Sequence, residues 1–141
     1  MRLLSLLRTA AIAAAAIALA LAPARAAEQI GLATFTATIA SGQSLSAEVD
    51  LGANILLGIA MPAAWTAADL TFQVSPDGGV TWLELQTTSA AVDFKAAAGQ
   101  FIGVDPTALR GFNALKVRSG TSASPVNQSA TAVLTLVGRA Y

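Results

Sequence analysis

The chain of 141 residues contains no cysteine and no histidine. Without these side chains it cannot build a Ser-His-Asp or Cys-His catalytic site, the common zinc sites, or the imidazole proton shuttle that works near neutral pH. Disulfides are excluded as well, so packing must stabilise the fold. These absences remove most hydrolase mechanisms, and we expect a protein that is not an enzyme.

Charged residues are also scarce, at 11% of the chain. A glycosidase needs only two paired carboxylates, but the available acids show no recognisable pairing. The pool consists of Asp69, Asp77, Glu84, Asp93 and Asp105. No stretch places three acidic residues at the alternating positions of a calcium loop. We therefore expect no metal and no cofactor.

The first 26 residues have the pattern of a signal peptide. Arginines precede an uncharged run over residues 9–22, and Ala24-Arg25-Ala26 supplies small residues for cleavage. The 14-residue run is shorter than the roughly 20 residues that a membrane-spanning helix needs. The sequence predicts general secretion from a bacterium to the periplasm or the cell exterior, with a mature domain over residues 27–141 and no membrane span after cleavage.

Cleavage would also change the charge of the protein. Loss of Arg2, Arg8 and Arg25 leaves five of the eight basic residues against eight acidic ones, a net charge of −3. A nucleic-acid binder needs a basic surface, and only Lys116 and Arg118 lie close together in the sequence. We expect no nucleic-acid partner.

The mature chain alternates apolar and polar residues with period two, which is typical of half-buried β-strands. Strands are expected over residues 33–39, 45–51, 70–74, 80–85, 91–94, 100–104, 112–119 and 131–137, with the last buried for most of its length. A further apolar segment, residues 55–61, is expected in the middle of a sheet. These patterns predict one all-β domain, an antiparallel β-sandwich or jelly roll of about eight or nine strands.

Three segments interrupt the strand pattern. Residues 62–69 surround Trp65 with small residues and are expected to form a helical turn. Asp105, placed before a proline, predicts a capped turn over residues 105–109. Residues 120–129 are expected to form a polar loop.

Residues 75–82, Ser-Pro-Asp-Gly-Gly-Val-Thr-Trp, match the Asp-box pattern Ser-x-Asp-x-Gly-x-Thr-Trp. Proline presets the first corner, the two glycines tolerate positive φ, and Asp77 is expected to bond the backbone two residues on. The pattern occurs once, which excludes a propeller of repeated blades. We expect its fixed positions to be structural: Ser75, Asp77, Gly79, Thr81 and Trp82.

Four residues are candidates for ligand binding. Trp65 and Tyr141 are aromatic groups on which a sugar ring could stack, while Lys116 and Arg118 share one strand face and could bond a glycan or an acidic partner. The alternatives are core packing for the aromatic residues and a solvated face for the basic ones. Self-association through the face of Thr34, Thr36 and Thr38 is a further possibility, because exposed strand edges pair readily.

Three phrases of the sequence resemble small β-sandwich proteins from the structural genes of tailed phages, prophages and gene-transfer particles. They are residues 61–73, 115–121 and 125–128. The resemblance implies a non-catalytic virion-surface or tail-associated module. Behind a secretion leader, the expected function is an exported module for binding or assembly, with a glycan, an envelope or virion protein, or a second copy as partner. The alternative is a virion structural or decoration protein.

Overall fold

The computed structural model describes residues 31–141 of the chain. As predicted, this part is all-β, with eight strands and a single short 3-10 helix. The strands are β1 (Leu32–Ile39), β2 (Val49–Asp50), β3 (Asn54–Ala60), β4 (Leu70–Ser75), β5 (Leu83–Glu84), β6 (Phe101–Gly103), β7 (Ala114–Ser119) and β8 (Ala132–Ala140). The signal peptide predicted for residues 1–26 lies outside the described residues. Within residues 31–141, no helix is long and apolar enough to cross a membrane.

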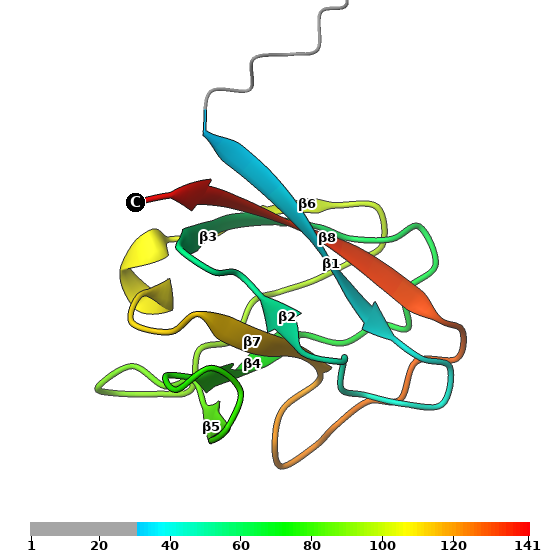
Figure 1. Cartoon of the computed structure of the whole chain (residues 1–141). Coiled ribbons are helices and arrows are strands. Elements are labelled where there is room, and N and C mark those ends of the chain that lie inside the picture. The colour runs from blue at the N-terminus through cyan, green and yellow to red at the C-terminus, as the bar shows by residue number, and fades with distance from the viewer. Residues whose placement is uncertain (1–30) are drawn as a thin grey trace, which may run out of the picture. The chain divides into compact units, whose positions relative to one another are not determined.

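The strands form two antiparallel sheets of four strands each (Figure 1). The first sheet has the order β1-β8-β3-β6 and the second the order β2-β7-β4-β5. The pairs β1–β8, β2–β7, β3–β6 and β4–β5 are nested along the chain. The chain therefore runs out along one side of an antiparallel ribbon and returns along the other, with the β4–β5 hairpin at the closed end.

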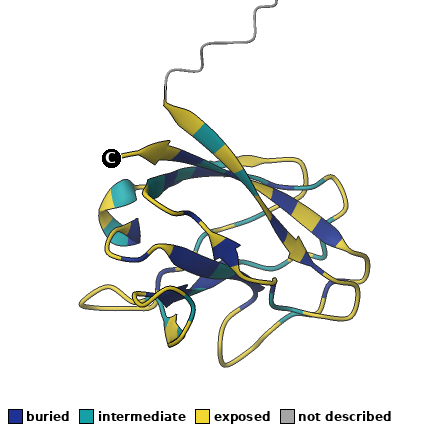
Figure 2. Cartoon of the chain, viewed as in Figure 1, coloured by how far each residue is buried: buried dark blue, intermediate teal, exposed yellow. Residues whose placement is uncertain are grey.

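The hydrophobic core lies between the two sheets. Successive side chains of a strand point to opposite faces, and the inward ones from β1, β3 and β8 join those from β4 and β7 in one buried cluster. Phe72 is the largest fully buried side chain, and its ring packs edge-on against Phe94 with 5.5 Å between centroids. Along β1 and β8, buried and exposed residues alternate (Figure 2). The result is a sandwich-like all-β fold.

The predicted capped turn is confirmed as the 3-10 helix η1 (Pro106–Leu109). Asp105 is its N-cap, and its carboxylate accepts a hydrogen bond from the Thr107 amide at 2.8 Å. This bond lowers the pKa of Asp105 because it stabilises the charged form. Leu109 is buried and ties the turn to the core.

The predicted middle strand is also confirmed, because β3 lies between β8 and β6. Its register against β8 shifts between Leu56 and Gly58. A β-bulge of this kind disturbs the alternation of faces, so that Leu56 and Ile59, three positions apart, both point into the core. Gly58 lies on the outer face and is buried there because the Phe101 ring packs against it.

The strand predicted over residues 45–51 is wrong for most of its length, since only β2 is formed there. Ser46 turns inward and Ala47 outward, opposite to the predicted pattern. The reason is a pair of bonds to Val117: the Ser46 amide donates to the Val117 carbonyl at 2.8 Å, and the Ser46 hydroxyl accepts from the Val117 amide at 2.9 Å. A polar side chain that finds a buried partner overrides the hydrophobic pattern.

Two other local predictions are wrong. Residues 91–94 form no strand and make only isolated bridges, one of which joins Phe94 to Leu70. Residues 62–69 contain no helical turn and instead run as an irregular loop from β3 to β4. In both segments tertiary contacts hold the backbone in place, so its conformation does not depend on a regular alternation of apolar and polar residues.

The strand predicted over residues 131–137 is confirmed as β8. The prediction that this strand is buried for most of its length is wrong. Only one face of β8 is buried, and Val133 on the other face is 49% exposed. The Phe101 ring covers Gly58 on this outer face, while Val133 remains in contact with solvent.

Candidate functional site

A hollow of about 320 Å³ lies between the β3–β4 loop and the β7–β8 loop. We call it the Trp65 hollow. Its lining residues are Ala63, Ala64, Trp65, Thr66, Gln128, Ser129 and Ala130. This volume is at the lower end of the range of small-molecule sites, about 300–1,000 Å³. Every lining residue is uncharged.

Gln128 holds the two loops together. Its side-chain oxygen accepts from the Thr66 amide at 2.8 Å, and its side-chain nitrogen donates to the Thr66 carbonyl at 3.1 Å and to the Ser119 hydroxyl at 2.6 Å. The residue is only 1% exposed, so these bonds form away from water. A buried amide with all these partners is a rigid connector, and it fixes the floor of the Trp65 hollow.

A third loop joins through the backbone of the same residue. The Gln128 amide donates to the Gln43 carbonyl at 2.9 Å, and the Gly42 amide donates to the Gln128 carbonyl at 2.8 Å. Loops after β1, β3 and β7 therefore meet at one end of the sandwich-like fold. Binding residues are often found on loops that a rigid scaffold positions in this way.

Trp65 is positioned by contacts on two sides. It packs against the hydrophobic core as a half-buried side chain, and its indole nitrogen donates to the Ala68 carbonyl at 3.1 Å. The same residue lines the hollow. An aromatic ring fixed in this manner would lose little conformational entropy on binding.

Two residues with hydroxyl groups line the same hollow. The Thr66 and Ser129 hydroxyls are 3.0 Å apart and hydrogen-bonded, and the Ser129 amide donates to the Thr66 hydroxyl at 3.0 Å. Both side chains are exposed enough to exchange these bonds with a ligand. The Trp65 hollow thus combines an aromatic ring with neutral hydrogen-bonding groups.

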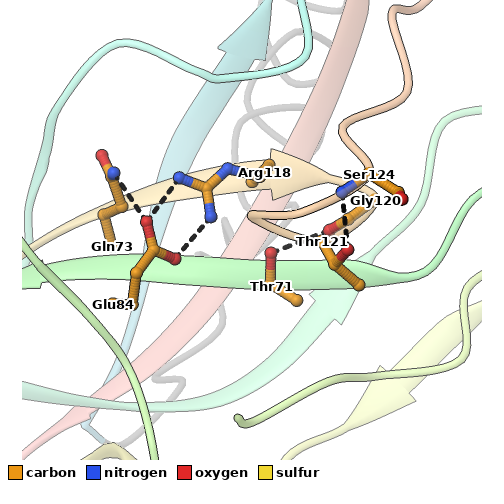
Figure 3. A network of polar contacts seen from close by, with 7 residues as sticks. All are labelled: Thr71, Gln73, Glu84, Arg118, Gly120, Thr121 and Ser124. Atoms are coloured by element: carbon orange, nitrogen blue, oxygen red, sulfur yellow. Dashed lines mark hydrogen bonds and ion pairs between the residues drawn. The ribbon is translucent and has the colours of Figure 1, made fainter.

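Arg118, the second basic candidate, is buried beside Glu84. It is 7% exposed, and its guanidinium bonds both carboxylate oxygens of Glu84, one of them at 2.6 Å (Figure 3). Gln73 donates to the same carboxylate at 2.9 Å. The bonds from Arg118 hold the pKa of Glu84 below its ordinary range despite partial burial. Arg118 therefore forms an internal ion pair with Glu84.

Lys116 lies on the same strand face, as predicted, and its ammonium sits 4.0 Å from the centroid of the Trp82 ring. This distance is within the range of a cation–π contact. Lys116 and Arg118 are therefore each engaged by another side chain, that of Trp82 and that of Glu84, and the two do not form an open basic patch.

Tyr141 is 74% exposed but does not belong to the Trp65 hollow. It follows the last residue of β8, whereas Ala130 in the hollow precedes the first residue of that strand. A nine-residue strand is about 30 Å long, so Trp65 and Tyr141 lie near opposite ends of β8. They cannot form one stacking platform.

The octet at residues 75–82 closes the β4–β5 hairpin through internal hydrogen bonds. The Ser75 hydroxyl donates to the Asp77 carboxylate at 2.8 Å and accepts from the Gly79 amide at 2.7 Å. The same carboxylate accepts from the Thr81 amide at 2.8 Å, and the Trp82 indole donates to the Gly79 carbonyl at 3.1 Å. Asp77 therefore bonds the amide four residues on, rather than two as the sequence suggested.

These bonds lower the pKa of Asp77 to about 2, with the Thr81 amide as the largest cause. Asp77→Ala is expected to destabilise the hairpin while the carboxylate of the parent protein is ionised. The difference in stability between the parent protein and the variant should have its full size above the ordinary aspartate pKa of 3.8. It should disappear as the pH falls through about 2. Thermal unfolding of both proteins from pH 7 to pH 2 measures it.

A matched control is Val80→Ala, which changes an 82% exposed side chain in the same turn. Its melting temperature should stay close to that of the parent protein at every pH. A difference for Asp77→Ala that is the same at pH 7 and pH 2 would contradict the ionic origin of the effect.

The acidic residues considered for catalysis have structural partners. Asp69 and Asp93 both pair with Lys95, the second at 3.6 Å. Asp77, Glu84 and Asp105 hold the turn, the Arg118 pair and the helix cap described above. Among residues 31–141 no three acidic side chains gather as a metal site.

No protein-family model matches the chain, and the comparison with curated proteins returned no match. Of the predicted binding residues, Trp65 lines this hollow, and Lys116, Arg118 and Tyr141 do not. Gln128 was missed because a glutamine in a polar loop carries no signal of burial; its partner Thr66 is 62 residues away in the sequence.

Proposed function

We propose that the protein is an exported, non-catalytic jelly-roll module that binds a neutral saccharide in the Trp65 hollow. The observation that carries this proposal is the composition of the hollow: an indole ring held by the core, two hydroxyls and a buried amide, with no charged group. Sugar rings present an apolar face and a rim of hydroxyls, which this combination complements.

The strand order supports the jelly-roll assignment. A jelly roll is a double sheet of eight strands, and the nested pairs from β1–β8 inward to β4–β5 follow from rolling up one long hairpin. Lectins use this architecture, although a fold by itself does not define a function. The export leader, expected from residues 1–26, would bring such a module to extracellular polysaccharides.

Three observations support a binding role over catalysis. The chain has no histidine or cysteine. Each carboxylate considered for a glycosidase has a structural partner, and none lines the Trp65 hollow. Retaining and inverting glycosidases both place two carboxyl groups about the scissile bond. Hydrolysis of a glycoside panel, abolished by one carboxylate substitution, would overturn this part of the proposal.

Trp65→Ala is expected to weaken retention on a neutral polysaccharide at least about tenfold, a loss of about 1.4 kcal/mol. The reason is that alanine removes the ring surface on which the sugar would stack. Retention is measured by affinity electrophoresis against neutral, acidic and basic polysaccharides, at a temperature where each variant remains folded. Trp65 packs against the core, so a lower melting temperature is expected too and does not decide the question.

The second tryptophan provides the control. Trp82→Phe leaves the hollow intact and makes Trp65 the only tryptophan, so its fluorescence should change as a binding saccharide is added. Unchanged retention by folded Trp65→Ala, or equal losses for the Trp65 and Trp82 variants, would contradict binding at the hollow.

The alternative function is a virion structural or decoration protein of phage origin. The same strand order favours it, because viral capsid proteins also use the jelly roll. This alternative requires the protein in particles, and mass spectrometry of purified particles tests for it. Its absence there would eliminate the virion role.

A further inference from the structure

The first sheet has one long edge that lacks the usual protection against pairing. Among the described residues, only β8 pairs with β1, so the other side of this eight-residue strand is open. Native edge strands are commonly shortened, bulged, or marked by a charge or a proline. β1 has none of these features: its sequence is Leu-Ala-Thr-Phe-Thr-Ala-Thr-Ile, and its register with β8 is unbroken.

The other edges differ from β1. β2 and β5, at the edges of the second sheet, have two residues each and carry Asp50 and Glu84. β6, at the far edge of the first sheet, has three residues. Short or charged edges give a partner strand little to bind. β1 therefore stands out among the four edges described here.

The outer face beside β1 is nearly uncharged as well. Thr34, Thr36 and Thr38 are exposed, and Thr36 lies opposite Thr135 of β8. Val133 is 49% exposed on the same face, and the ring of Phe101, 64% exposed, occupies the space above Gly58. Among the four strands of this sheet, Arg139 is the only charged residue.

We infer that two copies of the chain pair through β1, antiparallel and around a two-fold axis at Thr36. In this register Thr36 meets Thr36 of the second copy, and Thr34 meets Thr38. Cross-strand threonine pairs stabilise antiparallel strands. On the inner face, Phe35 meets Ala37 and Ala33 meets Ile39, so each large side chain faces a small one.

Neighbouring two-fold registers are less favourable. Centring the axis on Phe35 would place two phenylalanines opposite each other, and centring it on Ala37 would place Phe35 opposite Ile39. An axis that passes between two residues would place inward side chains of one copy opposite outward side chains of the other, because side chains alternate along a strand. The register centred on Thr36 joins the first sheet of one copy to the first sheet of the other. The result is one sheet of eight strands, with the order β6-β3-β8-β1-β1-β8-β3-β6.

The first test is the mass of the protein in solution. Protein purified from cells expressing the full chain should show twice the chain mass in light scattering over a range of concentrations. Thr36→Lys should give a monomer, because two ammonium groups would face each other about 5 Å apart across the axis. Thr36→Glu should also give a monomer, and an equimolar mixture of the two variants should restore the dimer.

A charge placed elsewhere on the same face is the matched control. Thr135→Lys adds lysine one strand further in, where the two charges of a dimer would be about 14 Å apart, beyond the screening length of about 10 Å at 0.1 M salt. This variant should remain a dimer. A monomeric parent protein, a dimeric Thr36→Lys variant, or a mixture that fails to re-form the dimer would each overturn the inference.

The register has its own test, helped by the absence of cysteine from the chain. Thr36→Cys should form a disulfide-linked dimer on mild oxidation. Thr34→Cys and Thr38→Cys should not cross-link alone, since identical positions would lie about 13 Å apart along the strands, but the two mixed together should. Efficient cross-linking of Thr34→Cys alone, or none for Thr36→Cys, would contradict the proposed axis.

Discussion

Glu84→Ala is expected to lower the free energy of unfolding by about 3 kcal/mol. Removing one partner of a buried ion pair costs about 3–5 kcal/mol, because the remaining charge stays away from water without compensation. The Arg118 side chain is 9% exposed and would be left in that state, whereas 31% of the Glu84 side chain already contacts solvent. The partial hydration of the pair places the expected loss at the lower end of that range. Denaturant unfolding measures the difference.

Removing both charges should cost less than removing one. A Glu84→Leu, Arg118→Met double variant leaves no buried guanidinium, and apolar replacements of buried pairs are often neutral. We expect the double variant to lie within about 1 kcal/mol of the parent protein. If its loss equals the sum of the two single losses, the two side chains are not coupled.

The same pair predicts a pH dependence. Arg118 holds the pKa of Glu84 below its ordinary range in the folded protein, so the unfolded state binds the proton at higher pH. The ion pair therefore stabilises the fold fully at pH values above the pKa of Glu84 in the unfolded chain. This stabilisation is lost as the pH falls through the pKa of Glu84 in the folded protein. The stability difference between the parent protein and Glu84→Gln should shrink over that acid range. A constant difference would contradict an ionic origin of this stabilisation.

The strands were predictable where one face of the chain is apolar and the other polar. β1 is an example: Thr34 and Thr36 alternate with apolar residues, and the structure exposes the threonines. The approximate number of strands and the antiparallel pairing followed from such segments and from the turn residues between them. The pattern failed at Ser46, where a bond to the Val117 backbone, 71 residues away, reversed the expected face.

The candidate site was predictable only in part, for a related reason. Trp65 was recognisable because a large aromatic residue stood alone among small ones. Arg118 had the same sequence features as a solvated basic residue, and only the fold brings Glu84 to it across 34 residues. Polar side chains take their role from partners that are distant in the sequence, and hydrophobic periodicity carries no information about those partners.

Gln128→Leu is expected to lower the free energy of unfolding by about 2–4 kcal/mol and to weaken the saccharide binding that we propose for the Trp65 hollow. Leucine is similar in size to glutamine but leaves the fully buried Ser119 hydroxyl without a partner, which costs about 1–3 kcal/mol. The amide and carbonyl of Thr66 lose their partners too, with a smaller penalty because this residue is half-buried. Denaturant unfolding gives the loss, and amide hydrogen exchange at Thr66 should become faster.

Two variants separate the lost hydrogen bonds from a general disturbance of the loop. Asn127→Leu changes the exposed neighbouring residue and should alter stability by no more than about 0.5 kcal/mol. Adding Ser119→Ala to Gln128→Leu should recover about 1 kcal/mol, because removal of both polar partners avoids an unsatisfied buried group. The double variant should not recover ligand binding, since the bonds that join the β3–β4 and β7–β8 loops remain absent. Stability and binding would then respond differently to one pair of substitutions, as expected if Gln128 both stabilises the fold and shapes the hollow.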